Sequence, residues 1–328
     1  MKKNYSRVCI EDSAYSLFLY FLISSKAEID STYYFFSNGV PYNIYQYFQG
    51  QSHYFNPRYY KEKRYLRLLS KFWLRLTANF YWPFLQTANI YGLEICAFSP
   101  GLMGKRKIVS IEDSLSNYIV VERKVRLPKL KALLFGAATN AEFPGRDFQC
   151  VDKVILTGLC ETGYPTHIST EFINIQKKWD ESTDEKKKLI LDIYNISEAD
   201  LKELMQRDEI LITQTLSEDG VITENEKITF YRQLLQGRDC SKILIKPHPR
   251  EMTDYKKYFP DIYVFEKKVP MQLLNVLGVK YKKVYTICST AAFSFSSDTE
   301  IVFLGSECHP NILQKCGVIK MPYKKYKN

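Results

Sequence analysis

Three polar clusters in the second half of the chain hold residue types that bind anions or move protons. They are Ser217-Glu218-Asp219-Gly220, His248-Pro249-Arg250 and Ser289-Thr290, and each follows a short apolar run typical of a β-strand. In open α/β sheets, ligands bind beyond the carboxyl ends of the strands. The coincidence of the three clusters therefore predicts a ligand site at one edge of a sheet.

The segment Lys246-Pro-His248-Pro-Arg250 is the strongest candidate within that site. Its two prolines fix the backbone and prevent a helix from starting, so they present His248 and Arg250 rigidly. An imidazole can donate a hydrogen bond to a phosphate or protonate it as it leaves, and Lys246 and Arg250 add fixed positive charge. We therefore expect this segment to bind a phosphate group.

Histidine is scarce in this chain, which favours a functional role for His248 over an incidental histidine in a surface turn. The other three histidines are interpreted as structural: His53, His167 and His309.

Ser289-Thr290 stands between an apolar run and the small residues Ala291-Ala292, which suit the start of a helix. Free backbone N–H groups and two hydroxyls would bind an anion there. An ordinary helix cap explains the same residues, so both interpretations stay open, and the nearness of His248 in the expected fold is what favours the anion site.

Two acidic segments could supply a proton acceptor, since a carboxylate can take the proton of an attacking hydroxyl. Asp219 lies in the tight loop Glu218–Gly220, which is otherwise a polar turn before a capped helix. Asp113, within Ile111-Glu112-Asp113-Ser114 of the first half, is a rival base.

We expect no metal cofactor, because the sequence contains no Asp-x-Asp pair and no cysteine pair with metal-ligand spacing. Lys246, His248 and Arg250 could replace a cation at a leaving phosphate.

The elements that position these clusters alternate between strands and helices, which argues for α/β halves with parallel sheets. Capping boxes at Ser182-Thr-Asp-Glu185 and Thr223-Glu-Asn-Glu226 start two helices, Ser197 caps a third, and Gly237 ends the helix after Thr223. The expected strands are residues 7–10, 32–36, 90–98, 107–111, 153–158, 209–214, 242–245, 263–265 and 284–288, and further helices are expected at 14–23 and 58–76.

The chain has 328 residues, enough for two domains, which we place at residues 1–178 and 179–328. The net charge of +10 suits nucleic acid, an anionic membrane or an anionic substrate. No nucleic-acid-binding motif is present, so we expect no nucleic-acid partner. The eight cysteines are expected to be buried free thiols, and without a signal peptide or a spanning apolar run the expected location is the cytoplasm.

The segment Arg58–Arg75 concentrates basic residues with interleaved aromatic and leucine side chains. It could lie on the inner face of a membrane or contact a lipid-linked acceptor. A half-buried helix with a solvated basic face is the alternative.

The chain resembles the bacterial lipooligosaccharide and capsule sialyltransferases of glycosyltransferase family 52 from Glu209 to about Phe295. Four segments in this order carry the resemblance: Ile212-Thr-Gln-Thr-Leu-Ser-Glu218-Asp219-Gly220, Lys246-Pro-His248-Pro-Arg250-Glu251, Pro270-Met-Gln-Leu-Leu274 and Tyr285-Thr-Ile-Cys-Ser289-Thr-Ala-Ala292. In the first half, Ile111-Glu112-Asp113-Ser114 is similar to the family's acidic motif, with Ser114 in place of the usual glycine.

The resemblance implies a GT-B fold, in which two Rossmann-like domains face a cleft. It also implies CMP-sialic acid as donor, inversion at the anomeric carbon, no metal, and transfer to a hydroxyl such as that of galactose on a surface glycan precursor. His248 would act at the CMP phosphate with Ser289 and Thr290 nearby, and Lys246, Arg250, Glu218 and Gly220 would border the donor.

By the same pattern a carboxylate serves as base, and we favour Asp219, with Asp113 as the alternative. A transferase of the same fold with another nucleotide sugar is the second hypothesis. Exchange of elements between subunits, as in some of these enzymes, would make a homodimer.

Overall fold

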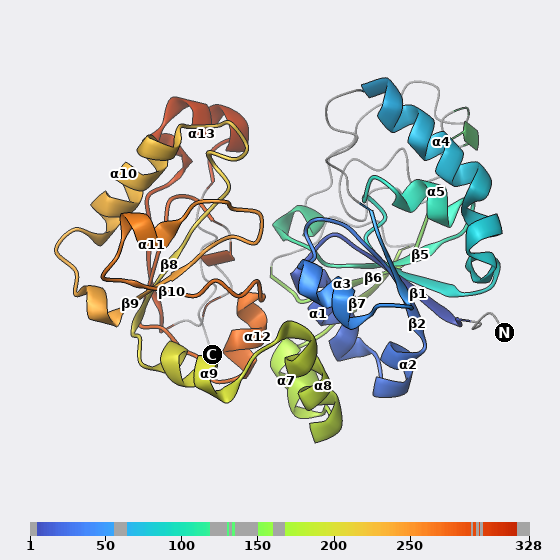
Figure 1. Cartoon of the computed structure of the whole chain (residues 1–328), viewed down its shortest axis with the longest axis horizontal. Helices are drawn as coiled ribbons and strands as arrows, with labels where there is room; N and C mark the ends of the chain where they lie inside the picture. The colour runs from blue at the N-terminus through green and yellow to red at the C-terminus, as the bar shows by residue number, and fades with distance from the viewer. Residues whose placement is uncertain are drawn as a thin grey trace. The chain divides into compact units, whose positions relative to one another are not determined.

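The computed structural model describes residues 5–55, 64–118, 130, 133–134, 150–159, 168–289, 291–292, 295 and 298–319 (Figure 1). The chain divides into two compact units, Met1–Tyr194 and Asn195–Asn328. Each unit contains one sheet whose described strands all pair in parallel.

The sheet of the first unit has the strand order β3-β2-β1-β4-β5-β6-β7, so the chain reverses direction across the sheet between β1 and β4. This is the order of the doubly wound dinucleotide-binding fold, extended by one strand. The strands are β1 (Arg7–Glu11), β2 (Thr32–Phe36), β3 (Ser52–Tyr54), β4 (Asn89–Gly92), β5 (Ile108–Ile111), β6 (Val151–Leu156) and β7 (Ser169–Phe172).

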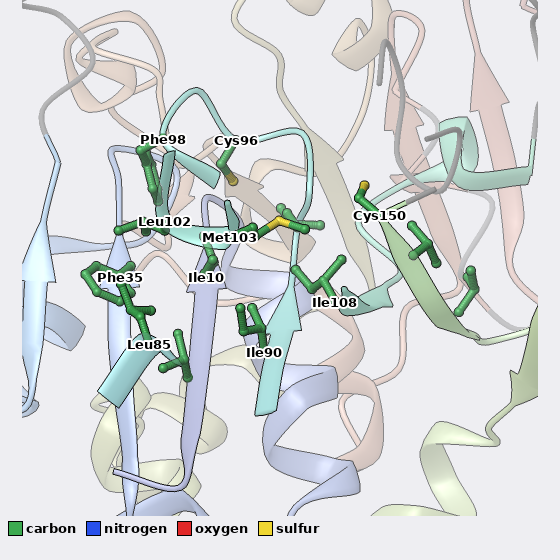
Figure 2. Close-up of a cluster of buried hydrophobic side chains, with 14 of the residues drawn as sticks. Ile10, Phe35, Leu85, Ile90, Cys96, Phe98, Leu102, Met103, Ile108 and Cys150 are labelled. Atoms are coloured by element: carbon green, nitrogen blue, oxygen red, sulfur yellow. The ribbon is translucent and has the colours of Figure 1, made fainter. Parts of the chain in front are cut away.

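Buried apolar side chains of this sheet pack against the helix α5 and the 3₁₀ segment η2. Figure 2 shows Ile10, Phe35, Ile90 and Ile108 from four strands in one cluster with side chains of those two segments. The helical segments of the unit are α1 (Ala14–Ile23), α2 (Lys26–Asp30), α3 (Tyr42–Tyr47), α4 (Arg64–Tyr81), η2 (Pro83–Gln86), α5 (Ser99–Met103), η3 (Leu115–Tyr118), α7 (Ile175–Asp180) and α8 (Asp184–Tyr194).

The structure corrects several sequence-based boundaries in this unit. The strand expected at 153–158 is β6 at Val151–Leu156, and the helix expected to end at residue 76 extends to Tyr81. The strand expected at 90–98 ends at Gly92, whose φ of 110° suits glycine and whose added Cβ would lie 2.1 Å from the carbonyl oxygen of Ile10. Helix α8 begins one residue later than expected, because Thr183 Oγ1, and not Ser182, accepts a hydrogen bond from the Lys186 N–H at 3.3 Å. Residues 58–63 of the expected basic helix lie outside the described residues.

The sheet of the second unit has the order β10-β9-β8-β11-β12, which repeats the doubly wound pattern with its switch point between β8 and β11. The expected capping boxes at Ser197 and Thr223 are confirmed, and Gly237 follows α10 with a φ of 71°. The elements are α9 (Glu198–Met205), β8 (Glu209–Ile212), α10 (Glu224–Leu235), η5 (Cys240–Lys242), β9 (Ile243–Lys246), α11 (Tyr255–Tyr258), β10 (Tyr263–Val264), α12 (Met271–Val276), β11 (Lys283–Thr286), β12 (Glu300–Phe303), η7 (Ser306–Cys308) and α13 (Pro310–Cys316).

The compact units differ from the expected domains 1–178 and 179–328, which stay a prediction. Residue 178 lies inside α7, and both α7 and α8 contact helices of the first unit, α1 and α3 respectively. Within the described part of the chain, no helix combines the length and the apolar character needed to cross a membrane.

Candidate donor-binding site

The three polar clusters of the second unit follow β8, β9 and β11, which are neighbours in one parallel sheet. Their carboxyl ends therefore meet at the same edge, as expected. The loop that bears Asp219 leaves the middle strand β8, and the segments of His248 and Ser289 leave its two neighbours. Since neighbouring strands lie about 4.8 Å apart, the ends of β9 and β11 are about 10 Å apart, a span that suits a phosphate and the group attached to it.

His248 is held as a neutral imidazole with a defined tautomer. Its Nδ1 accepts a hydrogen bond from the Arg250 N–H at 3.2 Å, so the ring proton resides on Nε2. Burial, together with the positive charges of Arg250 and Lys246, lowers the pKa of His248 to about 4. At neutral pH the ring therefore offers an Nε2–H donor, and in the free protein the hydrogen-bonding role is favoured over proton donation.

Lys246 is the most buried of the three basic residues. Its side chain lies at the end of β9 and is 5% exposed, and this burial lowers the pKa of its ammonium to about 8. The ammonium makes no hydrogen bond or ion pair with any residue that the structure describes, and Glu251 is the acid whose charge acts on it. An anion bound here would offset the cost of burying this charge.

Arg250 and Asp219 form an ion pair across the ends of β9 and β8. Arg250 Nη1 lies 3.3 Å from Asp219 Oδ1, and Thr215 Oγ1 donates to Asp219 Oδ2 at 2.7 Å. Although burial acts to raise it, the pKa of Asp219 lies below its ordinary value because of Thr215 and Arg250. A carboxylate in this state is a weak proton acceptor and a good anchor for the guanidinium.

Glu218 and Gly220 fold the loop that carries Asp219. Glu218 accepts the Met252 N–H at 2.9 Å and pairs with Lys227, and these contacts, against the effect of burial, lower its pKa to about 2. Gly220 has a φ of 68°, which closes the turn without strain. The carboxylate of Glu218 is thus used within the protein, and Gly220 serves the shape of the loop.

Two residues that the sequence analysis did not single out hold this edge together. Glu251 accepts hydrogen bonds from the His248 N–H at 2.6 Å and from Tyr255 at 2.6 Å, and it also contacts Thr213 at the end of β8. The ammonium of Lys227, whose side chain is fully buried, lies 3.4 Å from Glu251 Oε1. Glu251 is the last residue of the segment Lys246–Glu251 that carries the family resemblance, but only the fold shows that it fixes the backbone of His248.

Ser289 lies at the end of β11, and Thr290 lies outside the described residues. The Ala291 N–H donates to Ser289 Oγ at 3.4 Å, and the Cys288 N–H donates to Gln214 Oε1 at 2.8 Å across the switch point. The hydroxyl of Ser289 thus makes the local contact of a capping residue, although Ala291 and Ala292 form a 3₁₀ turn and not an α-helix. Its role toward an anion stays a prediction.

Acidic side chains gather at the carboxyl edge of the first unit's sheet. Glu112 is buried and accepts hydrogen bonds from Tyr15 at 2.8 Å and from the Thr157 N–H at 2.6 Å, so its carboxylate is fully used by the fold. Asp113 is half-buried, and the N–H groups of Asp113 and Ser114 donate to Asn117 Oδ1 at 2.8 and 3.0 Å.

Asp113 differs from Asp219 in its proton affinity. Burial, with Asp12 and Glu112 as like charges, raises the pKa of Asp113 above its ordinary value, and a hydrogen bond with the Ser13 side chain opposes the rise only in part. Of the two candidate bases, Asp113 is therefore the better proton acceptor.

The other candidate residues have structural environments. His53 packs edge-on against Phe55 and Trp82, and His309 caps α13 through Nδ1, while His167 lies outside the described residues. The described cysteines are all free, and four of them are buried, but Cys240 and Cys316 are exposed, against expectation. No group of three metal-ligating side chains occurs among the described residues, and independence from metal stays a prediction.

Comparison with known proteins identifies the chain's relatives. The family model described as glycosyltransferase family 52 matches residues 155–306, which include His248 and every other candidate of the second unit. The chain belongs to glycosyltransferase family 52. It is therefore a glycosyltransferase, and Asp113 lies outside the part that the family model matches.

Other matches extend over most of the length of this family 52 chain. It is 32% identical over 315 residues to a Haemophilus influenzae protein described only as uncharacterized, covering 95% of this chain and 98% of the relative. The structure of the GT-B domain of a Photobacterium damselae sialyltransferase matches with a TM-score of 0.53 and 13% identity, covering 90% of this chain and 89% of that one.

A second solved structure, an α/β-galactoside α-2,3-sialyltransferase from Photobacterium phosphoreum, matches with a TM-score of 0.50 and 11% identity, covering 90% and 88% of the two chains. At these identities the likeness concerns the fold, and the expected α/β fold of the GT-B class is confirmed.

Proposed function

We propose that this family 52 enzyme transfers sialic acid from CMP-sialic acid to a sugar hydroxyl, with inversion and without a metal ion. The observation that carries the proposal is the neutral His248, whose Nε2–H accompanies the cations Lys246 and Arg250 at the carboxyl ends of a doubly wound parallel sheet. The family assignment and the sialyltransferase neighbours support the same class of donor.

The leaving phosphate of CMP explains why three donors of this kind are needed. In the transfer step the bond between the anomeric carbon and the phosphate oxygen breaks, and its electron pair stays on the phosphate. Lys246, Arg250 and the Nε2–H of His248 stabilise that charge by hydrogen bonds and Coulomb attraction, as a divalent cation does in other transferases. Because phosphate is an anion, its binding also raises the pKa of His248.

The acceptor hydroxyl attacks the opposite face of the anomeric carbon and gives its proton to a carboxylate. We assign this role to Asp113, reversing the preference for Asp219 drawn from the sequence. The raised pKa of Asp113 and the ion pair between Asp219 and Arg250 support this assignment. Asp219 then orients Arg250 toward the phosphate and takes no proton.

The finer features of the reaction rest on the family resemblance. We propose a galactose-type hydroxyl of a capsule or lipooligosaccharide precursor as acceptor, and activity at the inner face of the cell membrane. CMP should bind in preference to UDP. A transferase of the same fold that uses a UDP-sugar would show the opposite preference.

The proposal is tested by measuring CMP release and sialylated product from CMP-sialic acid and lactose-type acceptors in the presence of EDTA. We expect turnover with inverted configuration, and a larger thermal shift with CMP than with UDP. Absence of product with every galactose-type acceptor, or a strict requirement for metal, would rule the proposal out.

A further inference from the structure

Helix α4 of the first unit exposes an apolar stripe that no described side chain covers. Leu66, Leu69, Trp73, Leu76 and Phe80 recur every three or four residues, which places them on one side of the helix. The last four are 60%, 64%, 60% and 78% exposed. Side chains of this size are normally buried, and a continuous exposed set of them marks an interaction surface.

A groove extends this apolar surface along the flank of α4. The groove has a volume of about 210 Å³ and is bounded by aromatic rings on both sides, with Trp73 and Tyr81 contributed by the helix. The wall away from the helix is formed by Phe55, Trp82 and Phe98. The stripe and the groove share Trp73, so they form one apolar surface, which we call the α4 surface.

The charge around the α4 surface selects the kind of partner. Helix α4 contains four basic residues, Arg64, Arg67, Lys71 and Arg75, and no acidic residue. Between residues 31 and 110 the sequence holds ten lysines and arginines but only two acids, Glu62 and Glu94, and the second is buried. An anionic partner is attracted to this region, whereas a second copy of the chain would bring the same positive charge and be repelled.

We propose that the α4 surface docks on an anionic lipid bilayer, with the stripe, Trp73 included, in the outer acyl region and Tyr81 at the level of the headgroups. Large apolar side chains, interfacial aromatic rings and nearby basic residues are the combination by which helices lie in a membrane interface. At 18 residues, α4 is long enough to lay about 27 Å of helix along the bilayer. The surface belongs to the unit that also bears Asp113, so docking would bring the acceptor-side base to a membrane-anchored glycan.

This inference narrows the earlier expectation for Arg58–Arg75. The stripe lies at 66–80 and extends beyond the basic segment, and the apolar side chains, more than the basic ones, make the contact. Only the biological reason for docking rests on the proposed function. Membrane docking itself is measured without donor or acceptor.

Cosedimentation of the full chain with vesicles tests the proposal. The vesicles contain phosphatidylcholine alone or mixed with phosphatidylglycerol, and we expect binding to the mixed vesicles that weakens as salt is added. The double variant Trp73→Glu with Phe80→Glu should lower the partition coefficient by at least about a hundredfold, because two large side chains can no longer enter the acyl region.

The matched control is Met205→Glu with Val318→Glu, which places the same two charges on other apolar residues, 53% and 55% exposed in the second unit. It should bind vesicles like the wild type, and both variants should keep turnover with a soluble lactose-type acceptor if the proposed function holds. A second readout is independent of any folding defect in the double variant. Lipids brominated on their acyl chains should quench tryptophan fluorescence in the wild type, and Trp73→Phe should reduce the quenching but keep the binding.

Three results would overturn the inference. They are no binding of the wild type to anionic vesicles, equal binding of the double variant, and a wild-type dimer in solution that the double variant converts to a monomer. The last result would show that a second copy covers the α4 surface.

Discussion

The backbone N–H of Arg250 lies 3.2 Å from Nδ1 of His248 and donates a hydrogen bond to it. This single contact fixes which ring nitrogen carries the proton and directs the Nε2–H away from the backbone of its own loop. The two prolines hold the loop in which the contact forms, and Glu251 fixes its start through the His248 N–H. The chain thus builds a neutral donor where its proposed substrate carries a phosphate.

Replacement of His248 by alanine should lower kcat by roughly 10²–10³-fold, the usual loss when one preorganised donor at a developing oxyanion is removed. His248→Gln should recover part of this loss, since its amide N–H reaches toward the position of Nε2. Initial rates with CMP-sialic acid measure both effects. His309→Ala, which removes a capping histidine of α13, serves as the control and should retain near-wild-type turnover.

Substitutions of Asp113 and Asp219 should have different effects on kcat and on the affinity for CMP. Asp113→Asn removes the proton acceptor, so kcat should fall by about 10²–10⁴-fold while the Kd for CMP stays unchanged. Asp219→Asn releases Arg250, so CMP should bind more weakly while most of kcat at saturation remains. Titration calorimetry and steady-state rates distinguish the two, and the reverse pattern would return the role of base to Asp219.

The low pKa of His248 should appear in the pH dependence of stability. The unfolded chain binds a proton at the ordinary His pKa of 6.5, whereas the folded chain binds it only near 4. The unfolded state therefore holds more protons between these values, and the free energy of unfolding falls as the pH is lowered through this window. Denaturant unfolding at several pH values should show a smaller fall for His248→Gln than for the wild type, and an identical fall would contradict the assignment.

The buried ammonium of Lys227 should be essential to the stability of the second unit. It lies within 3.4 Å of carboxyl oxygens of Glu218, Glu224 and Glu251, so Lys227→Met leaves the buried Glu251 and the largely buried Glu218 without the cation that neutralises them. We expect a loss of about 3–5 kcal/mol in the free energy of unfolding. Lys242→Met, which removes an exposed pair with Asp239 at 3.8 Å, should change it by about 1 kcal/mol or less in the same measurement.

Local patterns in the sequence predicted much of the fold. The strand at 32–36 and the helix at 14–23 coincide with β2 and α1, because an unbroken apolar run and the cap Ser13 define them. The strands β3, β7 and β12 were missed. These are edge strands of three or four residues, and their pairing depends on a sheet that only the fold supplies.

The sequence predicted where the candidate residues lie in the sheet but not the contacts among their side chains. The ends of β8, β9 and β11 could be brought together by a rule about parallel sheets, which is how Asp219, His248 and Ser289 were found. The proton affinity of Asp113 and Asp219 could not be predicted, because it depends on burial and on partners distant in sequence such as Asp12 and Arg250. The exposure of the α4 stripe was hidden for the same reason, since spacing shows that a helix has an apolar side but not whether that side faces the core.

The most direct test of the account observes the His248 imidazole by ¹⁵N NMR while CMP is added to the protein. In the free protein the account predicts a neutral ring protonated on Nε2, with a pKa of about 4. On saturation with CMP, the Nε2–H resonance should move and the pKa of His248 should rise, because the ring then donates to a phosphate. Saturation with CMP that leaves both the resonance and the pKa of His248 unchanged would contradict the account.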